Sequence, residues 1–494
     1  MKRLAALVFA AGVAIVAAGH IGSPNVVFDG LAGPYAVRVV VRPPEVVPGL
    51  AEVVVRAAAP DVQRVSIRPV FWRAGVKGAP TGDVLPRVAG QANVYSGQLW
   101  LMAYGAYSVY VTVDGPRGSG TVIVPVSSFA TGRLPVPAEL GAILVALGVL
   151  LVAGLLTLIH AGAGESLVAP GEAPSPAVRR RAWRITAIAA PLLAFAVFGG
   201  ATWWNAEDSA YRGHLFGSPR ADAAFTVDAA HRTLRLTVRD TASFRAIYAP
   251  VVPDHGKMLH LFLISTNGAQ TMAHLHPVQT DSLVFTTEVP WIPAGRYLLF
   301  GDLALENGLS LSVTNRIDVP VAPGAVTPSD TDDTWDRTPA VTTLAPDVTR
   351  ALSGGAYAMT WTGGETPLQS GTPVDLRFSV RDSSGSVVPV RPYLGMAAHA
   401  IIVGHDGSVF IHLHPMGTFP MVAQQVFALR DRGDTTAAGR LVTESLTAPD
   451  MAAMRMSGDI SFPYEFPKPG RYRLWVQVKP ADRVLTGTFD VDVR

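Results

Sequence analysis

The hydrophobic and polar positions along this chain follow two patterns. Over most of the sequence, short runs rich in Val, Leu, Ile and Thr alternate with polar positions and end near Gly or Pro, as in AVRVVVRP and TLRLTVRD. This period of two is typical of β-strands with one buried face. Two longer runs, residues 140–159 and 185–204, are predominantly apolar and contain no charged residue. The pattern predicts a mainly β chain that is interrupted by two apolar helices.

The strand-like runs fall into three segments, each with a Gly-x-Tyr sequence at the start of a late strand. The segments are residues 24–130, 206–322 and 341–494, and the Gly-x-Tyr sequences begin at Gly105, Gly295 and Gly470. In immunoglobulin-like sandwiches, a Tyr at such a place locks a corner of the fold. We therefore predict three immunoglobulin-like β-sandwich domains, with the Pro/Thr/Asp-rich residues 323–340 as a linker between the last two. The first sandwich is expected to be structural or to dock a partner.

Each apolar run is long enough to cross a bilayer as a helix, which takes about 20 residues. The segment between the runs, residues 160–184, carries Arg179, Arg180, Arg181 and Arg184. Positively charged residues in short loops stay in the cytoplasm. We expect two transmembrane α-helices in the cytoplasmic (inner) membrane, a cytoplasmic loop, and three sandwiches on the extracytoplasmic side. The alternative is that one run is a buried core helix.

Residues 1–19 have the composition of a secretory signal peptide. Lys2 and Arg3 precede an apolar stretch that ends in small residues. Cleavage after Gly19 would make His20 the N-terminal residue, whose amine and ring together can chelate copper. The alternative is an uncleaved N-terminal anchor.

The two C-terminal sandwiches each contain a predicted hairpin that ends in His-x-His-Pro. In residues 399–415, HAIIVGHDGSVFIHLHP, the central Asp-Gly pair is a signal for a two-residue type I′ turn. Folding the strands about that turn places His399 opposite His414, and Ile401 opposite His412. Because side chains on a strand alternate between faces, the three imidazoles then share one face.

The same arrangement occurs earlier, at residues 260–277, HLFLISTNGAQTMAHLHP. This loop is one residue longer, and if a three-residue turn absorbs that residue, His260 pairs with His276. The repeat makes a chance arrangement a poor explanation. The six candidate ligands are His260, His274, His276, His399, His412 and His414.

The strands of both hairpins are apolar on both faces, so we expect the His-bearing face to be covered. A buried imidazole without a partner costs about 1–3 kcal/mol. Neutral imidazoles around a transition-metal ion avoid that cost. We interpret the pattern as one three-His metal site in each C-terminal sandwich. Two alternatives are a hydrogen-bonded structural cluster and a catalytic or proton-relay group.

The rest of the composition favours one metal over others. The chain has no Cys, which excludes thiolate zinc sites, iron–sulfur clusters and Cys-ligated copper. Imidazole suits both copper and zinc, whereas thioethers suit Cu(I). An insertion in the third sandwich, residues 416–459, is rich in Met, which favours copper over zinc, although Met also fills gaps in apolar cores. Secondary ligand candidates are Met258, Met416 and His20, and Asp302 and Gln477 are placed to supply or orient a fourth group.

Two classes of function remain open. The first is a membrane-anchored, extracytoplasmic protein that buffers, senses or delivers copper, with a metal donor or acceptor protein in the envelope as its partner. The second is a non-metal envelope scaffold whose sandwiches bind a protein partner. A net charge of +2 gives no reason to expect nucleic acid. The sequence shows no nucleophile–base pair, phosphate-binding loop or paired carboxylates, so we do not expect an enzyme.

The two His-x-His-Pro hairpins, together with the Gly-Arg-Tyr strands, resemble those of the YtkA-like and FixH-like extracytoplasmic domains, and more distantly the CopC-type copper-resistance sandwiches. The resemblance covers the two C-terminal sandwiches best. It implies immunoglobulin-like folds and, in some members, copper handling or support of oxidase assembly. It extends to the six histidines of the two hairpins and to no other residue.

Overall fold

A computed structural model gives the structure of the chain. It describes residues 25–166, 168–169, 171–228, 231–239, 247–321, 330–339, 348–352, 355–362, 367–436, 440–441, 446 and 454–494. The chain divides into two compact units, Ala130–Phe216 on the one hand and Met1–Phe129 with Gly217–Arg494 on the other. The predicted signal peptide and His20 lie outside the described residues. The larger unit is mainly β, and all its sheets are antiparallel.

The first sandwich consists of two four-stranded sheets. One sheet contains β1 (Val26–Ala32), β2 (Tyr35–Arg42), β3 (Gly49–Ala57) and β6 (Val94–Leu101), and the other contains β5 (Asp83–Val84), β4 (Arg64–Phe71), β7 (Gly105–Gly115) and β8 (Gly118–Ser128). A short helix, α1 (Gly75–Gly78), follows β4. Alternate residues of β3, such as Val53 and Val55, are buried, while Glu52 and Arg56 are exposed. The alternation of apolar and polar residues in the sequence therefore predicted correctly which face of β3 is buried.

The second sandwich has the same two-sheet construction. Its outer sheet contains β14 (Val278–Asp281), β15 (Val284–Glu288), β10 (Arg232–Val238) and β9 (Ala221–Val227). Its inner sheet contains β11 (Val251–Val252), β16 (Gly295–Leu305), β12 (His260–Ser265), β13 (Thr271–Leu275), β18 (Thr334–Arg337) and, paired with β16, β17 (Ser310–Val319). Strand β18 falls within the predicted linker 323–340 and pairs with β13. This part of the linker is thus an edge strand of the sheet, because strands pair through backbone N–H and C=O groups and a polar segment has these as well.

The third sandwich carries the second His hairpin. One sheet contains β19 (Thr349–Ala351), β20 (Tyr357–Thr362), β21 (Pro373–Asp382) and β24 (Asp459–Glu465), and the other contains β23 (Phe410–Leu413), β22 (Ala398–Gly404), β25 (Gly470–Val478) and β26 (Leu485–Val493). The insertion between β23 and β24 includes a helix that the sequence analysis did not predict, α5 (Met421–Arg432). Gly433 ends this helix in the left-handed conformation, with φ of +79°.

A Tyr closes the same corner in all three sandwiches. The hydroxyl of Tyr297 donates to the carbonyl of Pro293 at 2.8 Å, and that of Tyr472 donates to the carbonyl of Lys468 at 2.7 Å. In the first sandwich the hydroxyl of Tyr107 accepts from the backbone N–H of Ala103 at 3.0 Å. Each contact spans four residues, as the Gly-x-Tyr sequences predict.

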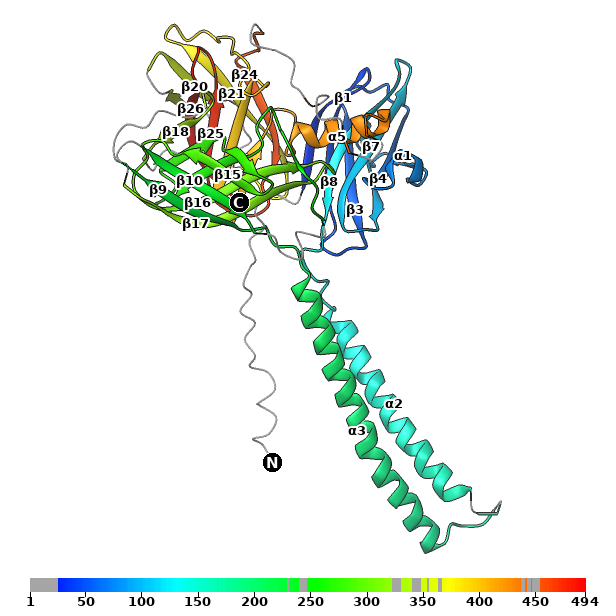
Figure 1. The fold of residues 1–494 in the computed structure, drawn as a ribbon. Helices are drawn as coiled ribbons and strands as arrows, with labels where there is room; N and C mark the ends of the chain where they lie inside the picture. The colour runs from blue at the N-terminus through cyan, green and yellow to red at the C-terminus, as the bar shows by residue number, and fades with distance from the viewer. Residues whose placement is uncertain are drawn as a thin grey trace. The chain divides into compact units, whose positions relative to one another are not determined.

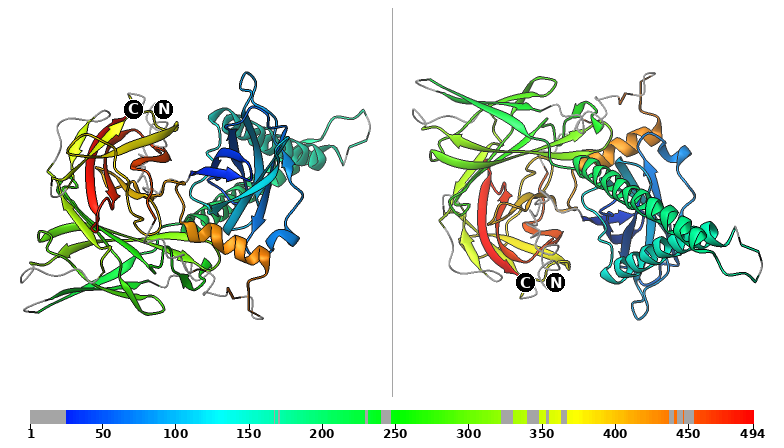
Figure 2. Two further views of the ribbon diagram at one scale, coloured as in Figure 1. Left: turned by 90° about the horizontal axis from the view of Figure 1, so that it is seen from above. Right: turned by 90° about the horizontal axis from the view of Figure 1, so that it is seen from below.

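The second and third sandwiches pack face to face through their His-bearing sheets (Figure 2). Phe262 and Phe300 from the second sandwich share a core with Ile401, Phe410 and Trp475 from the third. The rings of Phe300 and Phe410 stack with centroids 4.2 Å apart. This interface explains why β12 and β22 are apolar on both faces, because one face meets the strand's own sandwich and the other meets the neighbouring sandwich.

The insertion joins the third sandwich to the first. Phe419 lies in the core of the first sandwich and stacks on Phe28 with centroids 6.0 Å apart. The N–H of Asp29 donates to the carbonyl of Met416 at 2.8 Å. The helix α5 lies beside the strands of the first sandwich in Figure 1, where Gln424 donates to the carbonyl of Ile123 at 2.7 Å. The first sandwich is thus part of the larger unit.

The smaller unit contains two long helices, α2 (Ala138–Glu165) and α3 (Pro176–Gly213), which are long and apolar enough to cross a membrane. Both extend beyond the predicted spans 140–159 and 185–204. Helix α3 begins where the Ser175 hydroxyl accepts from the N–H of Val178 and Pro176 occupies the first turn. The predicted loop 160–184 is therefore helical at both ends, where α2 continues to Glu165 and α3 begins at Pro176 with Arg residues, which are good helix formers. Residues 206–213, which we assigned to the second sandwich, belong to α3.

Candidate metal centre

Both hairpins have the predicted register. In the third sandwich Ile401 lies opposite His412. In the second sandwich Phe262 lies opposite His274, and Leu261 lies opposite Leu275. Continuing each pairing by one residue places His260 opposite His276 and His399 opposite His414.

The turn of the third-sandwich hairpin differs from the prediction. The N–H of Gly404 donates to the carbonyl of Val409 at 2.9 Å, so the loop contains residues 405–408 rather than two residues. Gly407 has a φ of +71°, but Asp406 does not share the positive φ that a type I′ turn needs at both positions. The Asp406 carboxylate instead accepts from the backbone N–H of Ser408. The register survives because the loop widens by one residue on each strand.

All six predicted histidines are buried, and they form one cluster rather than two separate sites. The ring of His412 from the third sandwich lies 5.2 Å from that of His260 and 5.5 Å from that of His274, both of the second sandwich. The two hairpins meet because the faces that carry the histidines are also the faces through which the two sandwiches pack. We predicted one isolated site in each sandwich. The structure instead brings the histidines of both sandwiches into one cluster.

The first group of three contains His260, His274 and His276, whose ligating atoms lie within 4.8 Å of one another. His276 Nδ1 lies 2.9 Å from the Oδ1 atom of Asp333, and His274 Nδ1 lies 2.8 Å from the Oε1 atom of Gln477. In each contact the ring N–H donates to the oxygen, which leaves the lone pair on Nε2. Outer partners of this kind set the tautomer and orientation of metal-binding histidines.

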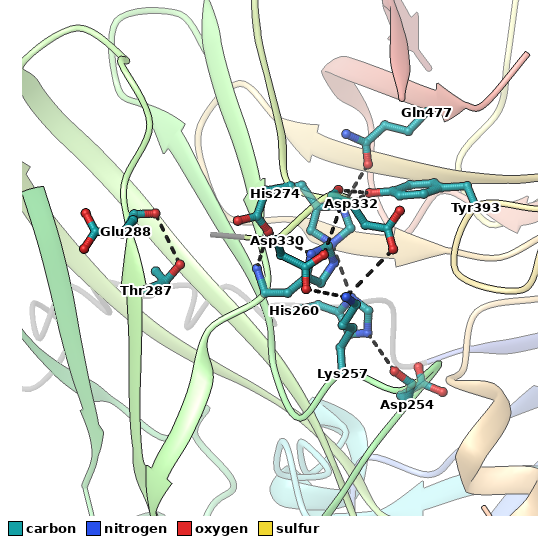
Figure 3. A network of polar contacts seen from close by, with 12 residues as sticks. Asp254, Lys257, His260, His274, Thr287, Glu288, Asp330, Asp332, Tyr393 and Gln477 are labelled. Carbon is teal, nitrogen blue, oxygen red and sulfur yellow. Dashed lines mark hydrogen bonds and ion pairs between the residues drawn. The ribbon is translucent and has the colours of Figure 1, made fainter. Parts of the chain in front are cut away.

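His260 and His274 approach each other in a way that suits a shared ion. His260 Nε2 lies 3.3 Å from the carbonyl oxygen of Asp254, so the N–H of this ring points outward and Nδ1 carries the lone pair. That Nδ1 atom lies 3.2 Å from His274 Nε2, which also carries a lone pair (Figure 3). Two nitrogens bound to one tetrahedral ion at about 2.0–2.1 Å are about 3.3–3.4 Å apart. The separation of 3.2 Å lies within hydrogen-bond distance and is also close to that of two ligands of the same ion.

The second group contains His255, His399 and His414, whose ligating atoms also lie within 4.8 Å of one another. His414 Nδ1 donates to the carbonyl of Phe419 at 3.1 Å. Within the described part of the chain, His414 Nε2 and both ring nitrogens of His399 have no hydrogen-bond partner. His255 comes from the second sandwich, where it holds a φ of +53° just before β12. This group therefore crosses the interface between the sandwiches.

The sequence analysis grouped His412 with His399 and His414, and this differs from the structure. The ligating atoms of His255 complete the group, whereas those of His412 do not belong to it. The ring of His412 nevertheless lies beside those of His399 and His414, and its Nδ1 atom lies 3.6 Å from the Oδ2 atom of Asp302. The reason is that His399 and His414 lie at the open end of the hairpin. His412 lies two residues further into the hairpin, opposite Ile401, where its ring meets Asp302 and His260 of the second sandwich.

Asp302 and Gln477 act across the interface rather than within their own sandwiches. Gln477 lies beside His399 in the sheet but binds His274 of the other sandwich, and Asp302 lies beside His260 but approaches His412. The hydroxyl of Tyr393, in the third sandwich, also lies 3.1 Å from His274 Nδ1. Each sandwich thus supplies the groups that orient a His of the other.

The burial of these groups keeps the imidazoles neutral. Burial lowers the pKa of His255 to about 4, and burial with the neighbouring His255 ring lowers that of His414 to about 4. Burial, reinforced by nearby imidazoles, holds the pKa values of His260, His274, His399 and His412 well below the usual 6.5. Burial also raises the pKa of Asp302 to about 7. At neutral pH these rings therefore carry the free lone pair that a metal ion needs.

The secondary ligand candidates do not strengthen the site. Met416 packs against the core of the first sandwich, and Met456 of the same insertion packs against the core of the third. Both have the gap-filling role that is common for Met. Met258 is half-buried, and Met451 lies outside the described residues.

Replacing Gln477 with Leu should weaken metal binding about 10–100-fold, because His274 Nδ1 would lose its closer partner, at 2.8 Å, and keep the Tyr393 hydroxyl at 3.1 Å. Leu has a similar size, so the packing at this buried position is largely kept. Competition of the full chain against a chromophoric chelator measures the change. Gln424→Leu is the matched control, since Gln424 binds a backbone carbonyl of the first sandwich. Equal affinities for the two variants would contradict the orienting role.

The comparison with protein families yields one match over less than a third of the chain. Residues 351–494, which form the third sandwich with its insertion, match a domain of unknown function (DUF8832). No curated protein matches the chain. The match thus marks this sandwich as a recurring unit and leaves its role open.

The chain also has weak similarity to several solved structures. One is a tetra-tandem repeat of a large adhesion protein (8% identity, TM-score 0.14, 90% of this chain and 71% of that chain). Another is alpha-2-macroglobulin of E. coli (10% identity, TM-score 0.20, covering 94% of this chain and 23% of that chain). A third is a putative membrane anchored protein from Corynebacterium diphtheriae (9% identity, TM-score 0.15, covering 95% of this chain and 94% of that chain). At such TM-scores these similarities carry no functional conclusion.

Proposed function

We propose that this protein is a membrane-anchored, extracytoplasmic transition-metal-binding protein, with copper as its ion and zinc as the alternative. The proposal includes immunoglobulin-like sandwiches and buffering, sensing or delivery of copper with a partner protein in the envelope. Its similarity to the YtkA-like, FixH-like and CopC-type domains rests on the hairpin motifs and the Gly-Arg-Tyr strands alone.

One observation carries the proposal: buried imidazole nitrogens point toward one another with their lone pairs free. Nε2 of His276, His412 and His414 has no hydrogen-bond partner among the described residues. Each such group costs about 1–3 kcal/mol if it stays unpaired. A hydrogen-bonded structural cluster would pair these atoms, whereas a metal site leaves them free for the ion.

The ligand set supports copper. The groups consist of imidazoles, and for such ligands the affinity of divalent ions rises to a maximum at Cu²⁺ and falls at Zn²⁺. The burial of most of the cluster also favours slow release. We therefore expect a tightly held ion that leaves when the interface between the sandwiches opens.

The direct test uses the full chain, purified in detergent and stripped of metal. After equilibrium dialysis against Cu²⁺ or Zn²⁺ and then buffer, elemental analysis should find at least one tightly held equivalent. Far-UV circular dichroism confirms that the stripped protein is folded. A folded protein that takes up neither ion would overturn the proposal in favour of an envelope scaffold.

The anchoring helices give a separate prediction. If α2 and α3 both cross the inner membrane, with the Arg-rich segment between their apolar parts in the cytoplasm, alkaline phosphatase fused after residue 130 or after residue 230 should be active. A fusion at residue 170 should be inactive. Fusion activities normalised to protein level measure this, and an active fusion at residue 170 would reverse the assigned orientation.

A further inference from the structure

The two groups of three histidines adjoin each other, and His412 lies between them. The ring of His412 lies 5.2 Å from that of His260 in the first group. It lies 4.7 Å from that of His414 and 5.2 Å from that of His399 in the second group. The two groups also approach directly, since the rings of His255 and His260 lie 6.4 Å apart.

We propose that the second and third sandwiches together hold two transition-metal ions in one dinuclear centre, on either side of the His412 ring. His260, His274 and His276 bind the first ion, and His255, His399 and His414 bind the second. This inference rests on the proposed function and adds to it the number of ions, their proximity and the role of His255.

The second site has a ligand set as complete as the first. His414 has its Nδ1 hydrogen bonded to the carbonyl of Phe419 and its Nε2 free, as His276 does with Asp333. The side chain of His255 is only 9% exposed, and its Nε2 has no hydrogen-bond partner in the described chain. The ring of His255 lies 5.5 Å from that of His399 and 5.3 Å from that of His414. Three converging imidazoles therefore face this site.

His412 is the group that connects the two ions. Its Nε2 has no hydrogen-bond partner among the described residues, and Nδ1 is 3.6 Å from Asp302, beyond hydrogen-bond distance. Its ring contacts two members of each group. It lies 5.5 Å from the ring of His274 in the first group, in addition to the distances given above. The two ions are thus separated by about one imidazole ring, wider than the roughly 3.5–4 Å of bridged two-metal enzymes.

The second ion also connects the two sandwiches. His255 belongs to the second sandwich, whereas His399 and His414 belong to the third. In the repeat, His255 corresponds to Leu394, which has a similar φ of +49° at the same distance before its hairpin. The ligand is therefore present in one repeat only, so the centre has one interface-crossing site rather than a symmetric pair.

The test measures stoichiometry and magnetic coupling in the full chain in detergent. Wild-type protein loaded with Cu²⁺ should hold two equivalents by elemental analysis. Its electron paramagnetic resonance spectrum should integrate to fewer spins than copper ions, or show a half-field transition. One equivalent, or two equivalents with a full spin count and no half-field signal, would overturn the dinuclear centre.

A pair of variants assigns the second site. His255→Leu, which places the residue of the other repeat at this position, should reduce binding from two equivalents to one and restore the full spin count. His231→Ala, at an exposed His outside the cluster, should keep two coupled equivalents. Two equivalents in a folded His255→Leu protein would overturn the assignment. Absence of any metal in the wild type would instead refute the proposed function itself.

Discussion

Replacing His276 and His414 together with Ala should reduce transition-metal binding by the full chain to nearly zero. Each of the two groups would fall from three imidazoles to two. The loss per site should exceed the roughly 10–100-fold that follows removal of a second-shell partner, because a ligand itself is removed. Equilibrium dialysis with elemental analysis measures the remaining equivalents.

The choice of these two histidines separates ligand loss from general damage. Both lie at the end of a hairpin, where Asp333 and the carbonyl of Phe419 hold them. Neither contributes to the apolar core between the sandwiches. His405→Ala is the matched control, because His405 lies in the turn of the third-sandwich hairpin beside Asp490. A double variant that is folded and still binds as much metal as the His405 variant would contradict the assignment of the ligands.

The local geometry of the hairpins could be predicted from the sequence, because it depends on short-range rules. Alternation of side chains fixes which residues share a face, and the Asp-Gly pair fixes where the chain reverses. The register at Ile401 and His412 follows even though the loop is wider than expected. The apolar pattern on both faces of β12 and β22 also predicted that the His-bearing face is covered.

What covers that face could not be predicted, because it depends on packing between the repeats. The sequence analysis treated each sandwich by itself and so missed that the two clusters meet. His255 was missed for the same reason. It corresponds to Leu394 in the other repeat, so matching the repeats directs attention away from it, and only the packed interface brings it to His399.

Asp333 was also missed, because it lies in a segment whose composition is typical of a linker. It binds both the Nδ1 and the backbone N–H of His276. Strand β18, which follows it directly, pairs with β13 and holds it there. An acidic residue in a polar segment that pairs with a His-rich hairpin could have been predicted as a partner of a His, because buried imidazoles need hydrogen-bond acceptors.

Lowering the pH from 7.5 to 5.5 should destabilise the metal-free protein strongly. The unfolded chain binds a proton on each His near pH 6.5, whereas burial holds the folded pKa of His255 and of His414 at about 4. Each folded pKa is lowered, so the unfolded state binds more protons between these values. The stability that each group contributes is therefore complete above about pH 6.5 and falls as the pH drops toward 4.

Two buried carboxyl groups oppose this effect. Burial raises the pKa of Asp302 to about 7 and also raises that of Asp254. These groups hold protons in the folded state and stabilise it as the pH falls through the same range. Six histidines with lowered pKa values outnumber them. Each such His costs about 1.4 kcal/mol in total between pH 7.5 and pH 5.5, so after the two carboxyl groups are subtracted the net loss of stability over the whole interval is roughly 4–6 kcal/mol.

Thermal unfolding of the full chain in detergent, followed by circular dichroism with a chelator present, measures the effect. Because 1 kcal/mol shifts the midpoint of a domain of 150–250 residues by about 2–4 °C, the unfolding temperature of the second and third sandwiches should fall by about 10 °C between pH 7.5 and pH 5.5. Copper at 100 times its dissociation constant should raise the midpoint at pH 7.5, since each bound ion adds about 2.7 kcal/mol. An unfolding temperature that stays constant over this pH range would show that the imidazoles are not buried as neutral groups.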